Sequence, residues 1–193
     1  MELSILEYYL IGINALGFVL YGIRARLYPG TKAGWRNAVL AAVVLAGGSL
    51  GVLLAILVFD GKAEKRNMMT LVLAVCALVV QIVALLFCGG VHQQQITFDF
   101  GGFFAENRWL ALYLLAMNAA ACIAFAVDKY RAVRRHSRIR IVTLLLLAFL
   151  GGSVGALLAM AVFRHKTRKD YFSIGVPMML VTHIILLFYI MNV

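Results

Sequence analysis

The stretch at residues 149–171, "FLGGSVGALLAMAVFRHKTRKDY", decides the fold, because it is long and apolar enough for a membrane helix yet interrupted by glycines. Gly151, Gly152 and Gly155 lie inside the apolar run, and a string of cations follows at residues 164–169. Glycine lets a backbone turn sharply, and it also lets two membrane helices approach closely. The stretch is therefore either a packed, glycine-kinked span or the tip of a re-entrant hairpin.

The composition identifies a membrane protein. Of the 193 residues, 64% are hydrophobic, which is well above the share in soluble proteins. Each apolar segment is close to the length of about 20 residues that a helix needs to cross a bilayer, and backbone groups in lipid must bond internally. The sequence predicts an all-α polytopic membrane protein whose helical segments lie at 5–23, 38–59, 68–88, 109–127, 141–163 and 171–191.

The charges and cysteines exclude several functions. Cys76, Cys88 and Cys122 show no CxxC or Cys/His spacing, so we expect no metal site and no cofactor. The net charge of +10 lies in short loops between apolar segments, where anionic lipid headgroups rather than nucleic acid are the expected partners. The first segment carries Glu7 and lacks a basic start, so we expect it to stay as a membrane helix and not to be a cleavable signal peptide.

The chain matches itself at an offset of 104 residues. Between 47–59 and 151–163 nine of thirteen positions are identical. This match predicts a tandem duplication, with a first three-helix repeat at 1–88, a connector at 89–107 and a second three-helix repeat at 108–193. The paired motif residues are Gly47, Gly48, Ser49 and Gly51 in the first repeat and Gly151, Gly152, Ser153 and Gly155 in the second.

The basic residues distinguish two topologies for segments 2 and 5. If all six segments cross, Lys and Arg divide nine to nine between the two sides, which gives no positive-inside signal. If segments 2 and 5 are re-entrant hairpins that turn at their glycines, 17 of the 18 Lys and Arg lie on one side. The abundance of spanning helices favours the first topology and the charges favour the second, so both stay open here.

The second half resembles a bacterial membrane family known as domain of unknown function 1294. The resemblance covers residues 118–192 and rests on Asp128-Lys129, a basic stretch, the glycine motif and the string Arg-His-Lys-Thr-Arg-Lys before Phe172. The sequence departs from the family pattern at Ile141-Val142, where Pro-Glu is expected, and at Ala159, where glycine is expected. The first half would then be a diverged copy. The resemblance implies residence in a bacterial cytoplasmic (inner) membrane and no established activity.

Two sets of polar residues are candidates for a functional site. Asp128 and His165 are the acid–base candidates, and cations beside them could bind the phosphate or carboxylate of a solute or lipid. If segment 5 re-enters, both lie on one face; if it spans, they lie on opposite faces. The predicted solute- or lipid-binding residues are Lys129, Arg134, Arg135, Arg164, His165, Lys166, Arg168 and Lys169. Simple anchoring of the loops to lipid would explain the same cations.

Inside the apolar segments the polar candidates are Asn14, Gln81, Asn118 and His183. Asn14 and Asn118 match at the 104-residue offset and are expected to form hydrogen bonds between helices. His183 is either functional or a neutral histidine bonded to Thr182 or a backbone carbonyl. Ser49 and Ser153 are expected to cap backbone groups beside the glycines.

Three functions stay open on this evidence. The first is transport or binding of an anionic or lipid-like solute at the repeat interface, as glycine-broken helices at matched positions suggest. The second is a membrane-embedded enzyme acting on a lipid phosphate, although the sequence has no nucleophile motif and enzymatic activity is not the favoured expectation. The third is a lipid-binding structural or partner protein, and a homo-oligomer is compatible with each.

Overall fold

The computed structural model describes residues 4–27, 34–61, 67–90, 96–164 and 166–193, and the regular structure in these ranges is helical. Six helical stretches are long and apolar enough to cross a membrane, which confirms the predicted all-α polytopic class. The duplication behind them stays a prediction. The stretches are Ile5–Leu27, Asn37–Phe59, Met68–Cys88, Arg108–Val133, Ile141–Phe163 and Asp170–Met191.

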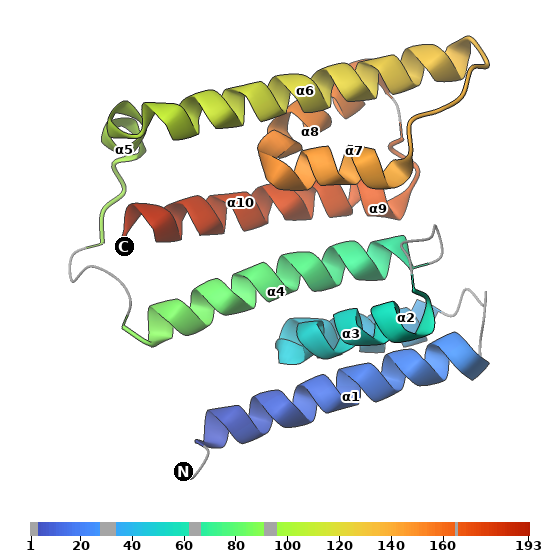
Figure 1. Cartoon of the computed structure of the whole chain (residues 1–193), viewed down its shortest axis with the longest axis vertical. Helices are drawn as coiled ribbons and strands as arrows, with labels where there is room; N and C mark the ends of the chain where they lie inside the picture. The colour runs from blue at the N-terminus through green and yellow to red at the C-terminus, as the bar shows by residue number, and fades with distance from the viewer. Residues whose placement is uncertain (1–3, 28–33, 62–66, 91–95, 165) are drawn as a thin grey trace. The chain divides into compact units, whose positions relative to one another are not determined.

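The chain forms two compact units, Met1–Ala84 and Leu85–Val193. The elements of the first are α1 (Ile5–Leu27), α2 (Gly34–Val43), α3 (Ser49–Phe59) and α4 (Met68–Cys88), whose last residues pass the boundary. Those of the second are α5 (Phe100–Glu106), α6 (Arg108–Val133), α7 (Ile141–Leu147), α8 (Ser153–Phe163), α9 (Asp170–Ser173) and α10 (Gly175–Met191) (Figure 1).

In the second unit the chain reverses direction between α7 and α8. Gly151 has φ of +116°, a conformation that favours glycine, and helical geometry breaks there. Asp128, near the end of α6, contacts residues on both sides of the helix pair, Ile139 before α7 and Lys166 after α8. The two limbs therefore start and finish at the same end of the unit, as Figure 1 shows. At 1.5 Å per residue, α8 is about 16 Å long, half the thickness of a bilayer core.

The first unit contains the same reversal. Gly47 has φ of +122° and separates α2 from α3. Hydrogen bonds join residues 9, 14 and 21 of α1 to residues 46, 51 and 60 in rising order, so α3 runs parallel to α1. Arg24, near the end of α1, donates to the hydroxyl of Thr70 at 3.1 Å, so α4 begins where α1 ends.

The last glycine of each motif has a different task from the first. A Cβ atom at Gly155 would lie 2.0 Å from the backbone oxygen of Asn118, and one at Gly51 would lie 1.9 Å from that of Asn14. The long helix and the second limb of the hairpin are therefore in backbone contact in each unit. Each motif therefore combines two kinds of glycine. The first, Gly47 or Gly151, lies at the turn, and the last, Gly51 or Gly155, lies at the contact between helices.

Candidate functional site

The tip of the second hairpin breaks helical bonding, and Asn118 on α6 restores part of it. Its side-chain Nδ2 donates to the backbone oxygens of Gly151 at 2.9 Å and Leu114 at 2.7 Å. Its Oδ1 accepts from the backbone N–H of Gly155 at 2.7 Å. Unpaired backbone groups are costly in lipid, so this one amide stabilises both sides of the turn. The bonds run from α6 to the hairpin of the same unit.

Two further side chains satisfy the neighbouring carbonyls. Tyr113 donates from its hydroxyl to the oxygen of Leu150 at 2.7 Å, and His183 Nε2 lies 2.6 Å from the oxygen of Phe149. A carbonyl only accepts, so Nε2 carries a hydrogen, and Nδ1 lies 2.9 Å from the hydroxyl of Ser153. Both ring nitrogens are thus occupied in supporting the turn. Thr182, the other partner expected for this histidine, bonds within its own helix.

In the first unit Asn14 makes the bonds that Asn118 makes in the second. Its Nδ2 donates to Leu10 at 2.8 Å and to Gly47 at 3.0 Å, and its Oδ1 accepts from the N–H of Gly51 at 2.8 Å. Every atom in this set has its counterpart 104 residues later. The two asparagines therefore hold equivalent turns, a more specific arrangement than the bonds between helices that the sequence predicts.

The remaining supports of the first turn are a tyrosine and an amide. Tyr9 donates to the oxygen of Ala46 at 2.6 Å, as Tyr113 does in the second unit. Gln81 on α4 donates from Nε2 to the oxygen of Val44 at 2.7 Å, and its Oε1 accepts from the hydroxyl of Ser49. Ser49 thus bonds a residue of α4, and Ser153 bonds a residue of α10. The expected capping by these serines is not seen, since neither α3 nor α8 has a side-chain cap at its start.

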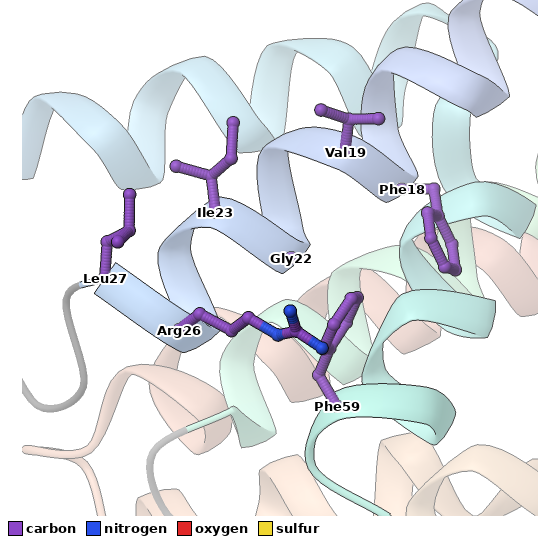
Figure 2. Close-up of a pocket in the computed structure, with 7 residues that line it drawn as sticks. All are labelled: Phe18, Val19, Gly22, Ile23, Arg26, Leu27 and Phe59. Atoms are coloured by element: carbon purple, nitrogen blue, oxygen red, sulfur yellow. The ribbon is translucent and has the colours of Figure 1, made fainter.

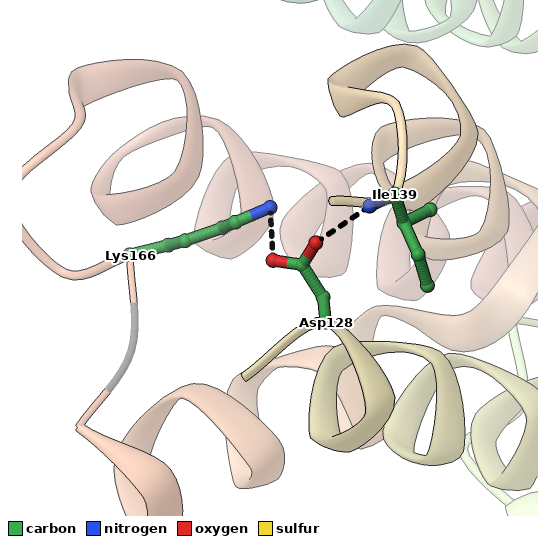
Figure 3. Close-up of polar contacts among 3 residues, drawn as sticks. All are labelled: Asp128, Ile139 and Lys166. Atoms are coloured by element: carbon green, nitrogen blue, oxygen red, sulfur yellow. Dashed lines mark hydrogen bonds and ion pairs between the residues drawn. The ribbon is translucent and has the colours of Figure 1, made fainter. Parts of the chain in front are cut away.

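A buried ion pair lies at the other end of the second hairpin, and Figure 3 shows its three residues. Asp128 is fully buried in the last turns of α6, which continues six residues beyond its predicted end at 127. Its Oδ1 accepts from the backbone N–H of Ile139 at 2.9 Å, and its Oδ2 lies 2.8 Å from Nζ of Lys166. The carboxylate therefore ties α6 to the chain segments before and after the hairpin.

Lys166 is held on both sides. Its Nζ lies 4.7 Å from the ring centre of Phe172, which is itself buried against Phe125 with ring centres 5.6 Å apart. Burial lowers the pKa of Lys166 below its ordinary value, and the bond to Asp128 opposes that change. A positive φ of 63° at Lys166 follows the positive φ of 43° at Arg164, so the chain turns tightly here.

The other predicted binding cations lie around this ion pair. Arg134, Arg135, Arg164, Arg168 and Lys169 are exposed, and Lys129 is half-buried at the end of α6. The contacts of Asp128 place all of these segments at one end of the second unit. His165 lies outside the described residues. The structure thus brings the predicted acidic residue to the predicted basic string, through Lys166.

At the same end of the first unit the charges are exchanged. Arg24 is the residue 104 positions before Asp128, and Asp60 is the residue 104 positions before Arg164. Asp60 accepts from the hydroxyl of Tyr21 and, at 2.8 Å, from the amide of Asn67. The acidic group is therefore on the long helix in one unit and at the end of the hairpin in the other.

Metal-binding groups are not evident in the part of the chain that the structure describes. No three His, Cys, Asp or Glu side chains there come together as ligands, and Cys88 and Cys122 are free thiols. The chemistry that the described site offers is the recognition of anions by exposed guanidinium and ammonium groups.

Comparison with known proteins confirms the family resemblance of the second half. Residues 118–172 match the family model for "Protein of unknown function (DUF1294)". The chain is similar to the "Uncharacterized protein YsdA" of Bacillus subtilis (strain 168), with 37% identity over 78 residues, which are 40% of this chain and 88% of that protein. The chain therefore belongs to the DUF1294 family, and the relative is comparable in length to one of its two units. No solved structure matches the chain.

Proposed function

We propose that this DUF1294 protein binds an anionic solute or lipid phosphate at the basic end of its second unit and passes it through the membrane beside the hairpin of α7 and α8. The observation that carries the proposal is the contact of Asp128 with both ends of that hairpin. Because of this contact, cations from three chain segments surround the base of a helix pair that is about half a bilayer long.

The placement in the membrane is part of the proposal. If both helix pairs enter and leave on one side, 17 of the 18 Lys and Arg lie on that side, and Arg108 is the exception. Such an asymmetry is typical of the cytoplasmic side of a bacterial inner membrane. A glycine-broken helix that ends within the bilayer is also a common element of solute pathways.

The state of Asp128 supports binding over acid–base catalysis. Both carboxylate oxygens already have partners, one in the backbone of Ile139 and one in Lys166. A general base must lie within reach of its substrate, and the carboxylate of Asp128 is fully buried. The exposed guanidinium groups of Arg134, Arg135 and Arg168 are open to an anion instead.

Cysteine accessibility tests the membrane placement. After replacement of the three native cysteines, single cysteines at Ala63, Phe98, Val133 and Thr167 are treated in intact cells with a membrane-impermeant maleimide. The proposal expects Ala63, Val133 and Thr167 to be labelled only after the membrane is opened, and Phe98 to be labelled from outside. Labelling of Val133 and Thr167 from opposite sides would refute the hairpin.

Flux from proteoliposomes tests the activity. Vesicles of phosphatidylcholine and phosphatidylglycerol are loaded with radiolabelled inorganic phosphate, and a second set carries fluorescent phosphatidylglycerol that dithionite bleaches from outside. We expect one of these probes to move faster than in empty vesicles, which identifies a free anion or a lipid as the substrate. The combined change Arg134→Gln, Arg135→Gln and Arg168→Gln should slow that movement about tenfold, since each removes charge-assisted bonds.

The matched control is Arg108→Gln, which removes the one cation at the opposite end of the unit and should leave flux unchanged. Equal rates with and without protein for both probes would overturn the proposal. So would full activity of the triple variant, whose changed residues are all exposed.

A further inference from the structure

The first unit carries an open groove on the outer face of α1, beside the end of α3. Its volume is about 380 Å³, within the range of small-molecule sites. Figure 2 shows Val19, Ile23 and Leu27 in a row along α1, with the ring of Phe59 beyond Arg26. All of its lining residues belong to the first unit, and none of them lies at a hairpin tip.

The walls of the groove are apolar and extend along the helix. Val19, Ile23 and Leu27 are 54%, 45% and 66% exposed, so their side chains are available to a ligand. Phe18 and Arg26 are eight residues apart on α1, which corresponds to about 12 Å along the helix axis. A groove of this length and composition fits the headgroup-proximal part of a lipid acyl chain that lies parallel to a transmembrane helix.

Gly22 makes the groove possible at its centre. A Cβ atom at this position would lie 2.8 Å from the ring of Phe59, so only glycine lets the ring lie against α1. The ring of Phe59 also contacts the ring of Phe18, with centres 5.7 Å apart. Together these rings form the side of the groove that faces α3.

Arg26 places a positive charge at the end of the apolar walls. Its guanidinium carbon lies 5.3 Å from the ring centre of Phe59, a cation–π contact that fixes its position. In the described part of the chain its N–H groups have no hydrogen-bond acceptor and no acidic partner. An arginine near hydrocarbon without an anion is costly, and a phosphate diester supplies both charge and acceptors.

We infer that this groove is a binding site for one anionic phospholipid, whose phosphate contacts Arg26 and whose acyl chain lies along Ile23 and Val19 on α1. Charge complementarity selects the anionic headgroup, and the length of the apolar walls selects an acyl chain over a free anion. The site is independent of the proposed transport function, and it stands if that function fails.

The second unit lacks the features that make the groove. At the 104-residue offset Gly22 corresponds to Ala126 and Arg26 to Tyr130. The methyl group of an alanine would displace the aromatic wall, and tyrosine brings no charge. The second unit therefore offers matched control positions on an equivalent helix, Ile123 for Val19 and Arg131 beside the counterpart of Arg26.

Native mass spectrometry of the full chain in mild detergent, titrated with phosphatidylglycerol or phosphatidylcholine, tests the site. We expect one phosphatidylglycerol to bind about tenfold more tightly than phosphatidylcholine. Arg26→Gln should remove the preference of this one bound lipid, and Val19→Trp should weaken the binding of either lipid at the groove, which it fills from an exposed position. Any lipid bound at the basic end of the second unit should be unaffected by both changes. Arg131→Gln and Ile123→Trp should bind as the unchanged protein does.

Each contrary outcome overturns the inference. Equal binding of the two lipids would show that the charge of Arg26 does not select a headgroup. Equal losses in Arg26→Gln and Arg131→Gln would show general attraction of lipid to a basic surface. Unchanged binding by Val19→Trp would show that the groove holds no acyl chain, and none of these results bears on flux through the second unit.

Discussion

The two hairpins agree at their tips and differ at their ends. At the tips Asn14 and Asn118 form the same three bonds to the same backbone positions. At the ends the second unit has a buried Asp128–Lys166 pair, whereas the first has Arg24 in the position of Asp128. At the tips the turn leaves backbone N–H and C=O groups without helical partners, and any hairpin away from water needs side chains that bond them. At the ends no common backbone requirement fixes the side chains. A difference in function between the two units is therefore expected at their ends.

The largest effect is expected at the packing glycines. Gly155→Ala and Gly51→Ala each put a Cβ atom about 2 Å from a backbone oxygen, so the helices must separate. We expect each to cost more than about 4 kcal/mol of unfolding free energy and to prevent folding in a marginal protein. Thermal unfolding of detergent-purified protein, followed by circular dichroism, measures the loss.

The control for this pair is Gly12→Ala, because an added Cβ at Gly12 meets no atom within 4 Å. This change should leave the protein as stable or slightly more stable, since alanine is the better helix former. A difference of more than about 2 kcal/mol between Gly51→Ala and Gly155→Ala would show that the tips are not equivalent.

The next effect is expected at the turn amides. Asn118→Leu leaves the oxygen of Gly151 and the N–H of Gly155 without partners in a buried turn, at a cost of about 3 kcal/mol. Asn14→Leu should cost the same in the first unit. Unfolding in sodium dodecyl sulfate compares the two, and a loss below about 1 kcal/mol in either would contradict the role of that amide.

A smaller effect is expected at the ends, and only in the second unit. Asp128→Asn keeps the acceptor for Ile139 but removes the charge that pairs with Lys166, at a cost of about 2 kcal/mol. The double change Asp128→Asn and Lys166→Met should recover most of this loss, since no buried charge remains. A double-mutant cycle with a coupling energy near zero would show that the pair contributes nothing.

The smallest effect is expected when His183 is replaced by glutamine, a change that tests whether His183 and Gln81 have the same role at the two tips. Gln81 bonds a backbone carbonyl and the hydroxyl of a serine, as the ring of His183 does. His183→Gln should therefore change the unfolding free energy by less than about 0.5 kcal/mol and leave flux unaffected. His183→Leu is the contrasting variant, with an expected loss of about 2 kcal/mol. Loss of flux in a stable His183→Gln variant would assign the histidine a function.

The six apolar helical segments could be predicted from the sequence because each has about the length that crosses a membrane, although a turn divides two of them into shorter helices. The local structure of the glycine motif could not, because packing and turning both need glycine. Only the contacts of Gly151 and Gly155 show that one turns and the other packs. The charge distribution favoured the hairpin but gave no geometry for it.

The side chains that bond the two turns could be predicted in part from the sequence. Asn14 and Asn118 are 104 residues apart, and so are Tyr9 and Tyr113, although a tyrosine near a helix end is equally typical of an interfacial anchor. Gln81 and His183 are 102 residues apart, so a fixed offset of 104 does not align them. Their common role became evident only from the carbonyls that they bond. The backbone N–H of Ile139 carries no sequence signal, and the partner of Asp128 there could not have been identified.

The reversal within each hairpin has a consequence for how such a protein arises and inserts. In the first unit Arg24 bonds Thr70, so α4 returns from the end of α1, and in the second the side chain of Asn192 accepts from the N–H of Thr97 at 2.7 Å. A unit that finishes where it starts can be copied and fused head to tail by a short connector. If the hairpins re-enter, each copy inserts with the sidedness of its parent, and a duplication of this kind requires no inverted ancestor and no exchange of basic loops across the membrane.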